Sequence, residues 1–231
     1  MSNIILQHFD GELRELDHLS IENMKQYAHT HGAEYQLVRG KPFREHLTGA
    51  CQKVHMLSDH YDQYDQVLMV DIDMFAPKGM FTNVFGVSGI GLYASTQQML
   101  HRKIANTAGG SMLYPYWGGA IYKMNLKTRM ILREQLGGDE SWMDKFNEAY
   151  KFEDEGIMHI LAKKANFQPE DAYMHQKWCQ CSFLPNPERA GFIHVRTKIT
   201  PQGPKREKML NWKELVDKKI IGAYKPHDSD A

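Results

Sequence analysis

Two aspartates come directly after an apolar run. Asp71 and Asp73 are separated by one residue and follow Val67–Val70, in which no position is polar. Such runs are typical of strands covered on both faces in parallel α/β sheets. Ligands collect beyond the carboxyl ends of these strands, and carboxylate oxygens suit Mg²⁺ or Mn²⁺. The pair indicates a metal site; the alternative is two aspartates that accept N–H groups in a turn.

A metal held by two carboxylates needs a further ligand, for which His194 is the candidate. It ends the apolar pair Phe192-Ile193 in an expected late strand, and Arg196 and Lys198 follow it. A neutral imidazole can ligate a metal, and the neighbouring cations can hold phosphate oxygens that the metal bridges. The alternative is that His194, one of 12 histidines, is an ordinary strand residue.

Three further motifs contain residue types that can do chemistry. Gly118-Gly119 precedes an apolar stretch, so it either leaves room for a ligand beside the backbone or marks a bulge or turn. The acidic run Glu153–Glu155 either begins a helix or orients a substrate hydroxyl and stabilises a cationic transition state. The segment His175–Cys181 has residue types of a zinc site, but its spacing matches no usual finger, so we do not assign zinc there.

The elements that must position these residues begin with a β-α-β unit. Residues 3–9 read as a core strand, followed by a helix capped by Asp17 or Ser20 and stopped at Gly32. Residues 35–38 read as the second strand. This opening is typical of an α/β protein.

The remaining chain continues the alternation. The segment 95–115 has weak periodicity and reads as a binding loop or lid. No linker of domain-separating composition occurs, so we expect one domain over residues 1–225 and a disordered tail over residues 226–231. The other expected elements are an apolar face over 50–61, a short helix near 80–85, strands at 89–94, 117–125 and 192–195, and helices at 126–136, 141–165 and 207–218.

Composition limits the function classes. The 231 residues carry 28 Lys+Arg and 28 Asp+Glu, so nucleic acid is a poor candidate for the main partner, although Lys205–Lys208 leaves room for a local anion site. No signal-peptide pattern and no run of 18 apolar residues occurs, so we expect no membrane span. The 3 cysteines, two of them in a Cys-x-Cys pair, fit a reducing cytoplasm.

Together these motifs resemble a known enzyme family. Asp71-Ile72-Asp73, the stretch Trp117–Asn125, Asp154-Glu155 and Ile193-His194 with Lys198 are similar to the nucleotide-sugar glycosyltransferases of the GT-A fold, closest to family 8, the glycogenin and bacterial lipopolysaccharide galactosyltransferase group. The resemblance spans residues 3 to 200. It implies a single Rossmann-like α/β domain with a mostly parallel central sheet flanked by helices. It also implies metal-dependent transfer from a UDP-sugar to a glycan or other hydroxyl acceptor, with retention.

The resemblance also implies roles for single residues. Asp71 and Asp73 would bind Mn²⁺ (or Mg²⁺) bridging the donor diphosphate, with Asp71 also near the ribose, and His194 would be the third ligand. Asp154 and Glu155 would be the catalytic residues near the transferred sugar. The other assigned nucleotide-sugar-binding residues are Gln7, Lys53, Gly118, Gly119 and Lys198, of which Lys198 would contact the diphosphate and Lys53 is matched by position alone.

The sequence departs from the family pattern around the late histidine, where the usual glycine and Pro-Trp are absent, and at Glu155, where the family has glutamine. A haloacid-dehalogenase-type phosphatase is one alternative, because it also places an aspartate pair after an apolar strand. However, that class has Thr or Val where this chain has Phe75, and its motif ends the first strand. A non-catalytic nucleotide- or sugar-binding module is the other alternative, and it would not need three convergent metal ligands.

Overall fold

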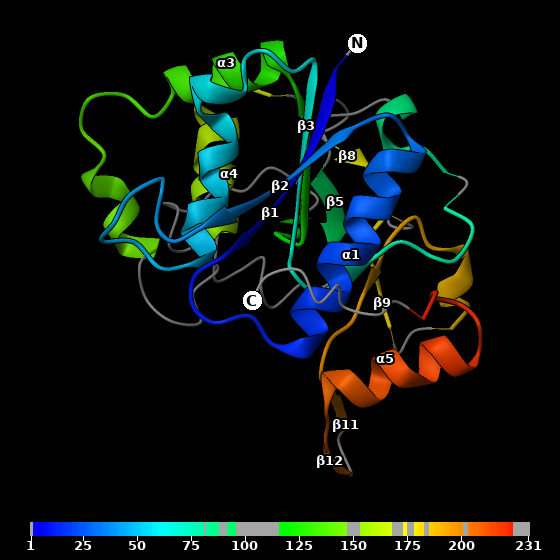
Figure 1. Cartoon of the computed structure of the whole chain (residues 1–231). Coiled ribbons are helices and arrows are strands. Elements are labelled where there is room, and N and C mark those ends of the chain that lie inside the picture. Colours follow the sequence, from blue (N-terminus) through cyan, green and yellow to red (C-terminus); the bar gives the residue numbers. More distant parts are fainter. Residues whose placement is uncertain are drawn as a thin grey trace.

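The computed structural model describes residues 2–80, 82–87, 92–95, 116–146, 153–167, 173–174, 178–182, 185–200 and 203–223. Its central sheet has the strand order β2-β1-β3-β7 (Figure 1). β1 pairs in parallel with β2 and β3, whereas β3 and β7 are antiparallel. The sheet is therefore mostly parallel, as the sequence predicted. Its strands are β1 (Asn3–Phe9), β2 (Glu34–Arg39), β3 (Gln66–Val70) and β7 (Ile121–Asn125).

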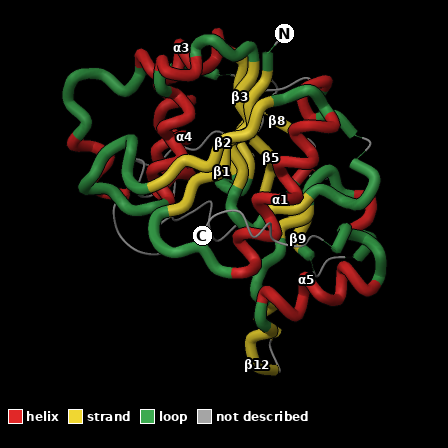
Figure 2. Tube along the Cα trace, viewed as in Figure 1, coloured by secondary structure: helices red, strands yellow, loops and turns green. Residues whose placement is uncertain are grey.

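Helices cover both faces of this sheet (Figures 1 and 2). Alternate strand residues point to opposite faces. Ile5, Leu68 and Val70 share one core cluster with Met24 and Tyr27 of helix α1 (Glu15–Thr30). The intervening strand residues pack in a second cluster with a 3-10 helix (Ala50–Leu57) and with helices α3 (Leu126–Glu134) and α4 (Glu153–Lys164). The absence of polar residues at positions 67–70 of β3 follows from this two-sided burial.

A small sheet of order β4-β10-β9 extends the molecule beyond the carboxyl end of β3. β10 pairs antiparallel with β4, which places His194 opposite Met74. The remaining strands form a sheet of order β6-β5-β8 and the hairpin β11-β12. The bounds are β4 (Met74–Phe75), β9 (Gln180–Cys181), β10 (Ile193–His194), β5 (Leu92–Ser95), β6 (Tyr116–Trp117), β8 (Tyr173–Met174), β11 (Lys198–Thr200), β12 (Gly203–Arg206) and the final helix α5 (Lys208–Asp217).

The N-terminus of α1 differs from the prediction that Asp17 or Ser20 caps the helix. The helix begins at Glu15, with Arg14 as the capping residue. Asp17 is the third helical residue, and its Oδ2 accepts a hydrogen bond of 2.9 Å from the backbone N–H of Arg14. A carboxylate at this position reaches back to a backbone donor that the helix leaves unpaired. At the other end, Gly32 follows the helix with a φ of +63°, as its predicted stop role requires.

Several other predicted elements are shorter or tighter in the structure. The segment 50–61 forms 3-10 turns over Ala50–Leu57 and Asp59–Tyr61, and the short helix near 80–85 reduces to Val84–Gly86. The expected strand 117–125 is divided between β6 and β7, because the chain turns at Gly119 and Ala120. The expected helix 141–165 is a 3-10 segment (Ser141–Phe146) and α4, and residues 147–152 between them lie outside the described part.

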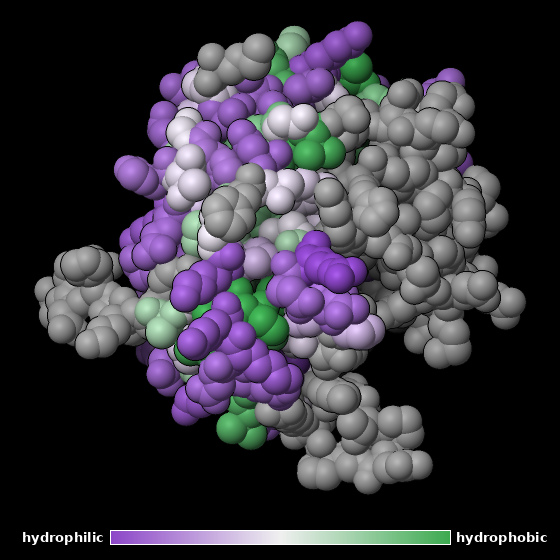
Figure 3. Space-filling view, turned by 90° about the vertical axis from the view of Figure 1, so that its right-hand side faces the viewer, coloured by the Kyte–Doolittle hydropathy of each residue, from purple (hydrophilic) through white to green (hydrophobic). Residues whose placement is uncertain are grey.

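The described surface in Figure 3 is mostly hydrophilic, with apolar residues visible only in small areas. None of the helices that the structure describes is long and apolar enough to span a bilayer. The single domain over residues 1–225 stays a prediction. The tail 226–231 and most of the expected loop 95–115 lie outside the described residues.

Candidate functional site

A pocket of about 560 Å³ opens at the carboxyl end of β3. Its wall comes from the ends of β1, β3 and β10, from the start of the first 3-10 helix, and from the first turn of α4. Asp71 directly follows β3, and its backbone N–H donates a hydrogen bond of 2.9 Å to the carbonyl of Ala120. The pocket therefore lies beyond the carboxyl end of a strand, where the sequence predicted a ligand site.

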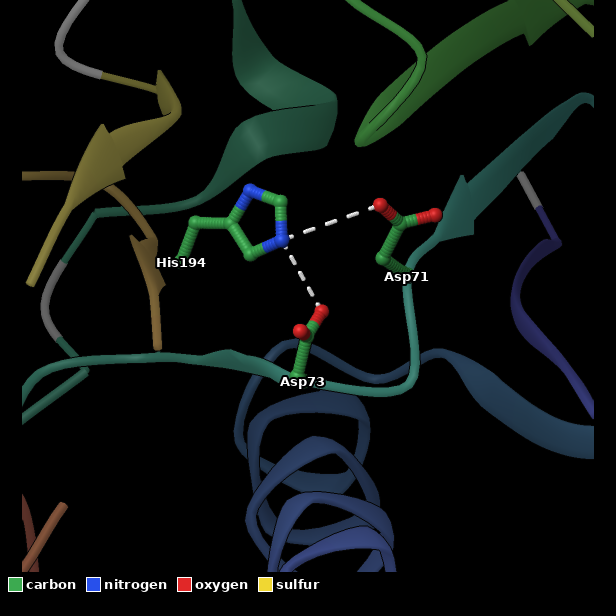
Figure 4. A group of neighbouring side chains, drawn as sticks. All are labelled: Asp71, Asp73 and His194. Carbon is green, nitrogen blue, oxygen red and sulfur yellow. Dashed lines mark ion pairs between the residues drawn. The ribbon is translucent and has the colours of Figure 1, made fainter. Parts of the chain in front are cut away.

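Asp71, Asp73 and His194 converge in this pocket (Figure 4). His194 Nε2 lies 2.9 Å from Asp73 Oδ1 and 3.8 Å from Asp71 Oδ2. The pairing of β10 with β4 brings His194 beside the aspartates, and the backbone N–H of Val195 donates to the Asp73 carbonyl at 2.9 Å. The three residues that the sequence singled out as metal ligands are thus brought together.

The geometry of these three side chains fits a divalent cation. Each offers one ligand atom, and these atoms all lie within 4.8 Å of one another. Two oxygen ligands about 2.1 Å from one Mg²⁺ and at right angles to each other are about 3 Å apart. Two carboxylate oxygens and one imidazole nitrogen are also a donor set that Mg²⁺ and Mn²⁺ accept. Burial would raise the pKa of Asp73, but His194 and Lys208 outweigh burial and hold this pKa well below its usual value.

The buried ammonium of Lys53 links the aspartate pair to the opposite wall of the pocket. Its Nζ lies 2.7 Å from Asp71 Oδ1, 2.8 Å from Asp154 Oδ2 and 2.7 Å from the carbonyl oxygen of Gly119. Burial alone would lower the pKa of Lys53, but the charges of Asp154 and Asp71 outweigh burial and raise it. Lys53 is therefore a fixed positive charge whose three ammonium hydrogens all have acceptors.

Asp154 and Glu155 lie in the first turn of α4 and line the pocket. Asp154 Oδ2 also accepts a hydrogen bond of 2.8 Å from the hydroxyl of Tyr122. Burial raises the pKa of Asp154 and the nearby Asp71 adds to this, whereas Lys53 and Tyr122 oppose it by favouring the ionised form. The carboxylate therefore has two positioned donors on one oxygen.

Gly119 lies against both acidic residues, and this position has no room for a side chain. Its backbone N–H donates to Glu155 Oε1 at 2.6 Å. A Cβ atom at Gly119 would be 2.5 Å from Asp154 Oδ2 and 2.8 Å from Glu155 Cγ. The alternative that the two glycines mark a turn is confirmed, because the chain turns at Gly119 and Ala120. The space beside Gly119 is taken by the two acidic side chains, and room for a ligand there stays a prediction.

Gln7, which the sequence assigned to donor binding, is fully buried beneath the aspartates. Its Nε2 donates to Ser20 Oγ and to the backbone carbonyl of Asp71, both at 3.0 Å. Its Oε1 accepts from the Tyr35 hydroxyl at 2.9 Å. The pocket wall contains His8, Phe9 and Asp10 of the same strand end, but Gln7 is not part of it.

The overall fold matches solved structures, although the sequence alone finds no relative. No protein-family model matches the sequence, and no curated protein matches it. A glycosyltransferase involved in glycosylation of the major capsid of PBCV-1 superposes with a TM-score of 0.56 at 10% identity, over 93% of this chain and 99% of that one. The galactosyltransferase LgtC, solved with donor and acceptor sugar analogs, gives 0.51 at 12% identity, over 96% and 97%. The chain has the GT-A fold.

A third match agrees with this GT-A assignment. The bifunctional glycosyltransferase WbbM superposes with a TM-score of 0.57 at 12% identity, over 94% of this chain. This chain covers only 51% of WbbM. The resemblance inferred from the sequence is thereby confirmed at the level of the fold.

Gly118 and Lys198, which the sequence assigned to donor binding, contribute no described side chain to the pocket. Gly118 is buried next to Gly119 but does not line the pocket. The backbone of Lys198 begins β11, and its side chain lies outside the described part of the chain.

The sequence missed two residues that contact the site, Tyr122 and Lys208. Lys208, the first residue of α5, donates a short hydrogen bond to Asp73 Oδ2. It belongs to the basic run Lys205–Lys208, and this run was the sequence feature that could have pointed to Lys208. Tyr122 carries no such signal, because an aromatic residue in a strand is ordinarily part of the core.

Proposed function

We propose that this chain is a metal-dependent glycosyltransferase that moves a sugar from a nucleotide-sugar donor, a UDP-sugar, to a hydroxyl of a glycan acceptor. The observation that carries the proposal is the convergence of Asp71, Asp73 and His194 in a pocket at the end of β3 of a GT-A fold. The matched structures support it: they are glycosyltransferases, and one of them holds donor and acceptor sugar analogs.

Asp71, Asp73 and His194 would hold Mn²⁺ or Mg²⁺. When bound, the cation would supply positive charge where the departing nucleoside diphosphate becomes negative. Lys208, beside Asp73, and Lys53, beside Asp71, add fixed positive charge to the same region. Lys198, which the family resemblance matches to a diphosphate contact, is proposed for the same role.

Asp154 and Glu155 would act at the sugar end of the pocket. The Asp154 carboxylate, held by Lys53 and Tyr122, is proposed to stabilise positive charge that develops on the transferred sugar. Glu155 is held by the backbone N–H of Gly119 and is proposed to orient the sugar or the acceptor hydroxyl. Retention of the anomeric configuration is part of the proposal, and NMR of the first-formed product tests it.

The phosphatase and the non-catalytic module are less well supported. The fold likeness is to glycosyltransferases, and no feature of the pocket specifically favours either alternative.

Nucleotide-sugar chemistry also fits a cytoplasmic setting, which the three free cysteines Cys51, Cys179 and Cys181 support.

Calorimetric titration of UDP in the presence of Mn²⁺, and again with a chelator, tests the proposal. The expected result is binding that needs the metal and is lost in Asp73→Asn. Asp144→Asn is the matched control, because Asp144 is exposed and pairs with His46 away from the pocket. UDP-sugars are then screened for hydrolysis and transfer. If no nucleoside diphosphate binds with or without metal, the proposal is wrong.

A further inference from the structure

Each of the two metal-site carboxylates has one oxygen facing His194 and the other oxygen on a lysine. Asp71 directs Oδ2 towards His194 Nε2, while its Oδ1 lies 2.7 Å from Lys53 Nζ. Asp73 directs Oδ1 towards the same nitrogen, while its Oδ2 accepts a hydrogen bond from Lys208. The two lysines therefore leave one oxygen of each aspartate for a cation. Lys208 balances the charge of Asp73, whereas Lys53 is shared between Asp71 and Asp154.

These lysine contacts weaken the binding of a divalent cation to the two aspartates when no nucleotide is present. The ammonium of Lys208 offsets the negative charge of Asp73, so an incoming cation is attracted to Asp73 less strongly than it would be without Lys208. The side chains of Lys53 and Lys208 are 10% and 34% exposed, so solvent screens their charges only in part. A nucleoside diphosphate would favour binding of the cation, because its negative charges attract the ammonium groups of Lys53 and Lys208.

Building on the proposed function, we propose that the protein binds the divalent cation together with the nucleoside diphosphate. Lys208 is the residue that makes binding of the cation depend on the nucleotide. Without the nucleotide, Lys208 lies on Asp73 and weakens binding of the metal alone. With the nucleotide present, the ammonium of Lys208 turns from Asp73 towards the diphosphate. The metal then gains the full charge of Asp73.

Lys208, rather than Lys53, has the freedom for this exchange. Lys53 is held by Asp71, Asp154 and Gly119 together. Lys208 is more exposed and extends from the first residue of α5. The helix itself is anchored, because Trp212 and Leu215 pack in a core cluster and Asn211 Nδ2 donates to the Arg196 carbonyl at 2.7 Å. A fixed backbone with a flexible side chain allows a local switch without movement of the helix.

The first test measures binding of Mn²⁺ alone, by electron paramagnetic resonance of the free ion. Lys208→Met should bind Mn²⁺ roughly tenfold more tightly than the unmodified chain, since a neighbouring unit charge commonly shifts such an equilibrium by one decade or more. Lys208→Arg keeps the charge and should bind as weakly as the unmodified chain. Lys218→Met, at an exposed position just after the same helix, is the matched control and should change nothing.

The second test repeats the titration with Mn²⁺ and UDP together. In this titration Lys208→Met should weaken binding instead of strengthening it. Lys208→Met should bind UDP about tenfold more weakly in the presence of Mn²⁺, because the diphosphate loses a cationic partner. Thermal unfolding of each variant confirms that it is folded. Unchanged or weaker Mn²⁺ binding by folded Lys208→Met would overturn the role of Lys208 while leaving the proposed function intact. Absence of UDP binding in the unmodified chain would overturn both.

Discussion

The ammonium of Lys53 lies 2.8 Å from Oδ2 of Asp154, in the interior between the proposed metal site and the proposed sugar end of the pocket. Asp71 is the second carboxylate on the same ammonium. One lysine thus keeps two buried or half-buried carboxylates close together without net repulsion. The arrangement ties the 3-10 helix to the end of β3 and to the start of α4.

Replacing Lys53 by methionine should destabilise the fold by about 3 kcal/mol, because it leaves the buried Asp154 charge without its partner. The loss should shrink at lower pH, where protonation removes the uncompensated charge. Urea unfolding at several pH values measures it. Lys25→Met, which removes an exposed pair with Glu22, should cost less than about 1 kcal/mol. Equal effects of the two substitutions would contradict the linking role of Lys53.

Gly119→Ala should lower the rate of donor turnover by roughly 100-fold, because its Cβ atom would displace Asp154 and Glu155 from the pocket wall. UDP-sugar hydrolysis or transfer measures this. Gly138→Ala serves as control, since a Cβ there would meet no atom within 4 Å. Normal turnover by Gly119→Ala would show that these two carboxylates do not act on the sugar.

Gln7→Met should reduce stability by about 1–2 kcal/mol, because the part-buried carbonyl of Asp71 and the buried Ser20 hydroxyl lose a donor. The Michaelis constant for the donor should change little, since Gln7 does not line the pocket. Denaturant unfolding and donor kinetics separate the two effects. A raised Michaelis constant at unchanged stability would instead support direct donor contact, as the sequence suggested.

Lys123 should make stability rise with pH in the alkaline range. Burial lowers the pKa of Lys123 to about 8, so above this value the folded chain releases a proton that the unfolded chain keeps up to its usual pKa near 10.5. The unfolded state then binds more protons, and the free energy of unfolding gains about 2 kcal/mol between roughly pH 7.5 and 10. This contribution is complete above the unfolded pKa and is lost as pH falls through 8.

Comparison with Lys123→Met isolates this contribution, because other alkaline titrations affect both proteins equally. The free energy of unfolding of the unmodified chain minus that of Lys123→Met should rise by about 2 kcal/mol between roughly pH 7.5 and 10. If this difference in free energy of unfolding stayed constant from neutral to alkaline pH, burial would not lower the pKa of Lys123.

Local patterns in the sequence were enough to predict the parts of the fold that depend on them. The apolar run before Asp71 predicted a strand covered on both faces, because a strand with no polar residue has no side to expose to water. The β-α-β opening and the final helix were also predicted, since the spacing of apolar residues reports the repeat of the local structure. Asp71, Asp73 and His194 were found as a candidate set because few residue types bind such cations.

Tertiary structure decided which groups touch. The sequence gives no distance between His194 and Asp73; the antiparallel pairing of β10 with β4 sets it. The antiparallel edge strand β7 likewise depends on contacts between distant segments. The sequence assigned Lys53 to the nucleotide by position and marked Lys205–Lys208 as a possible anion site, but only folding places Lys53 and Lys208 each on an aspartate. Charge pairs depend on separations of a few ångströms between segments far apart in the chain, so local sequence patterns do not encode them.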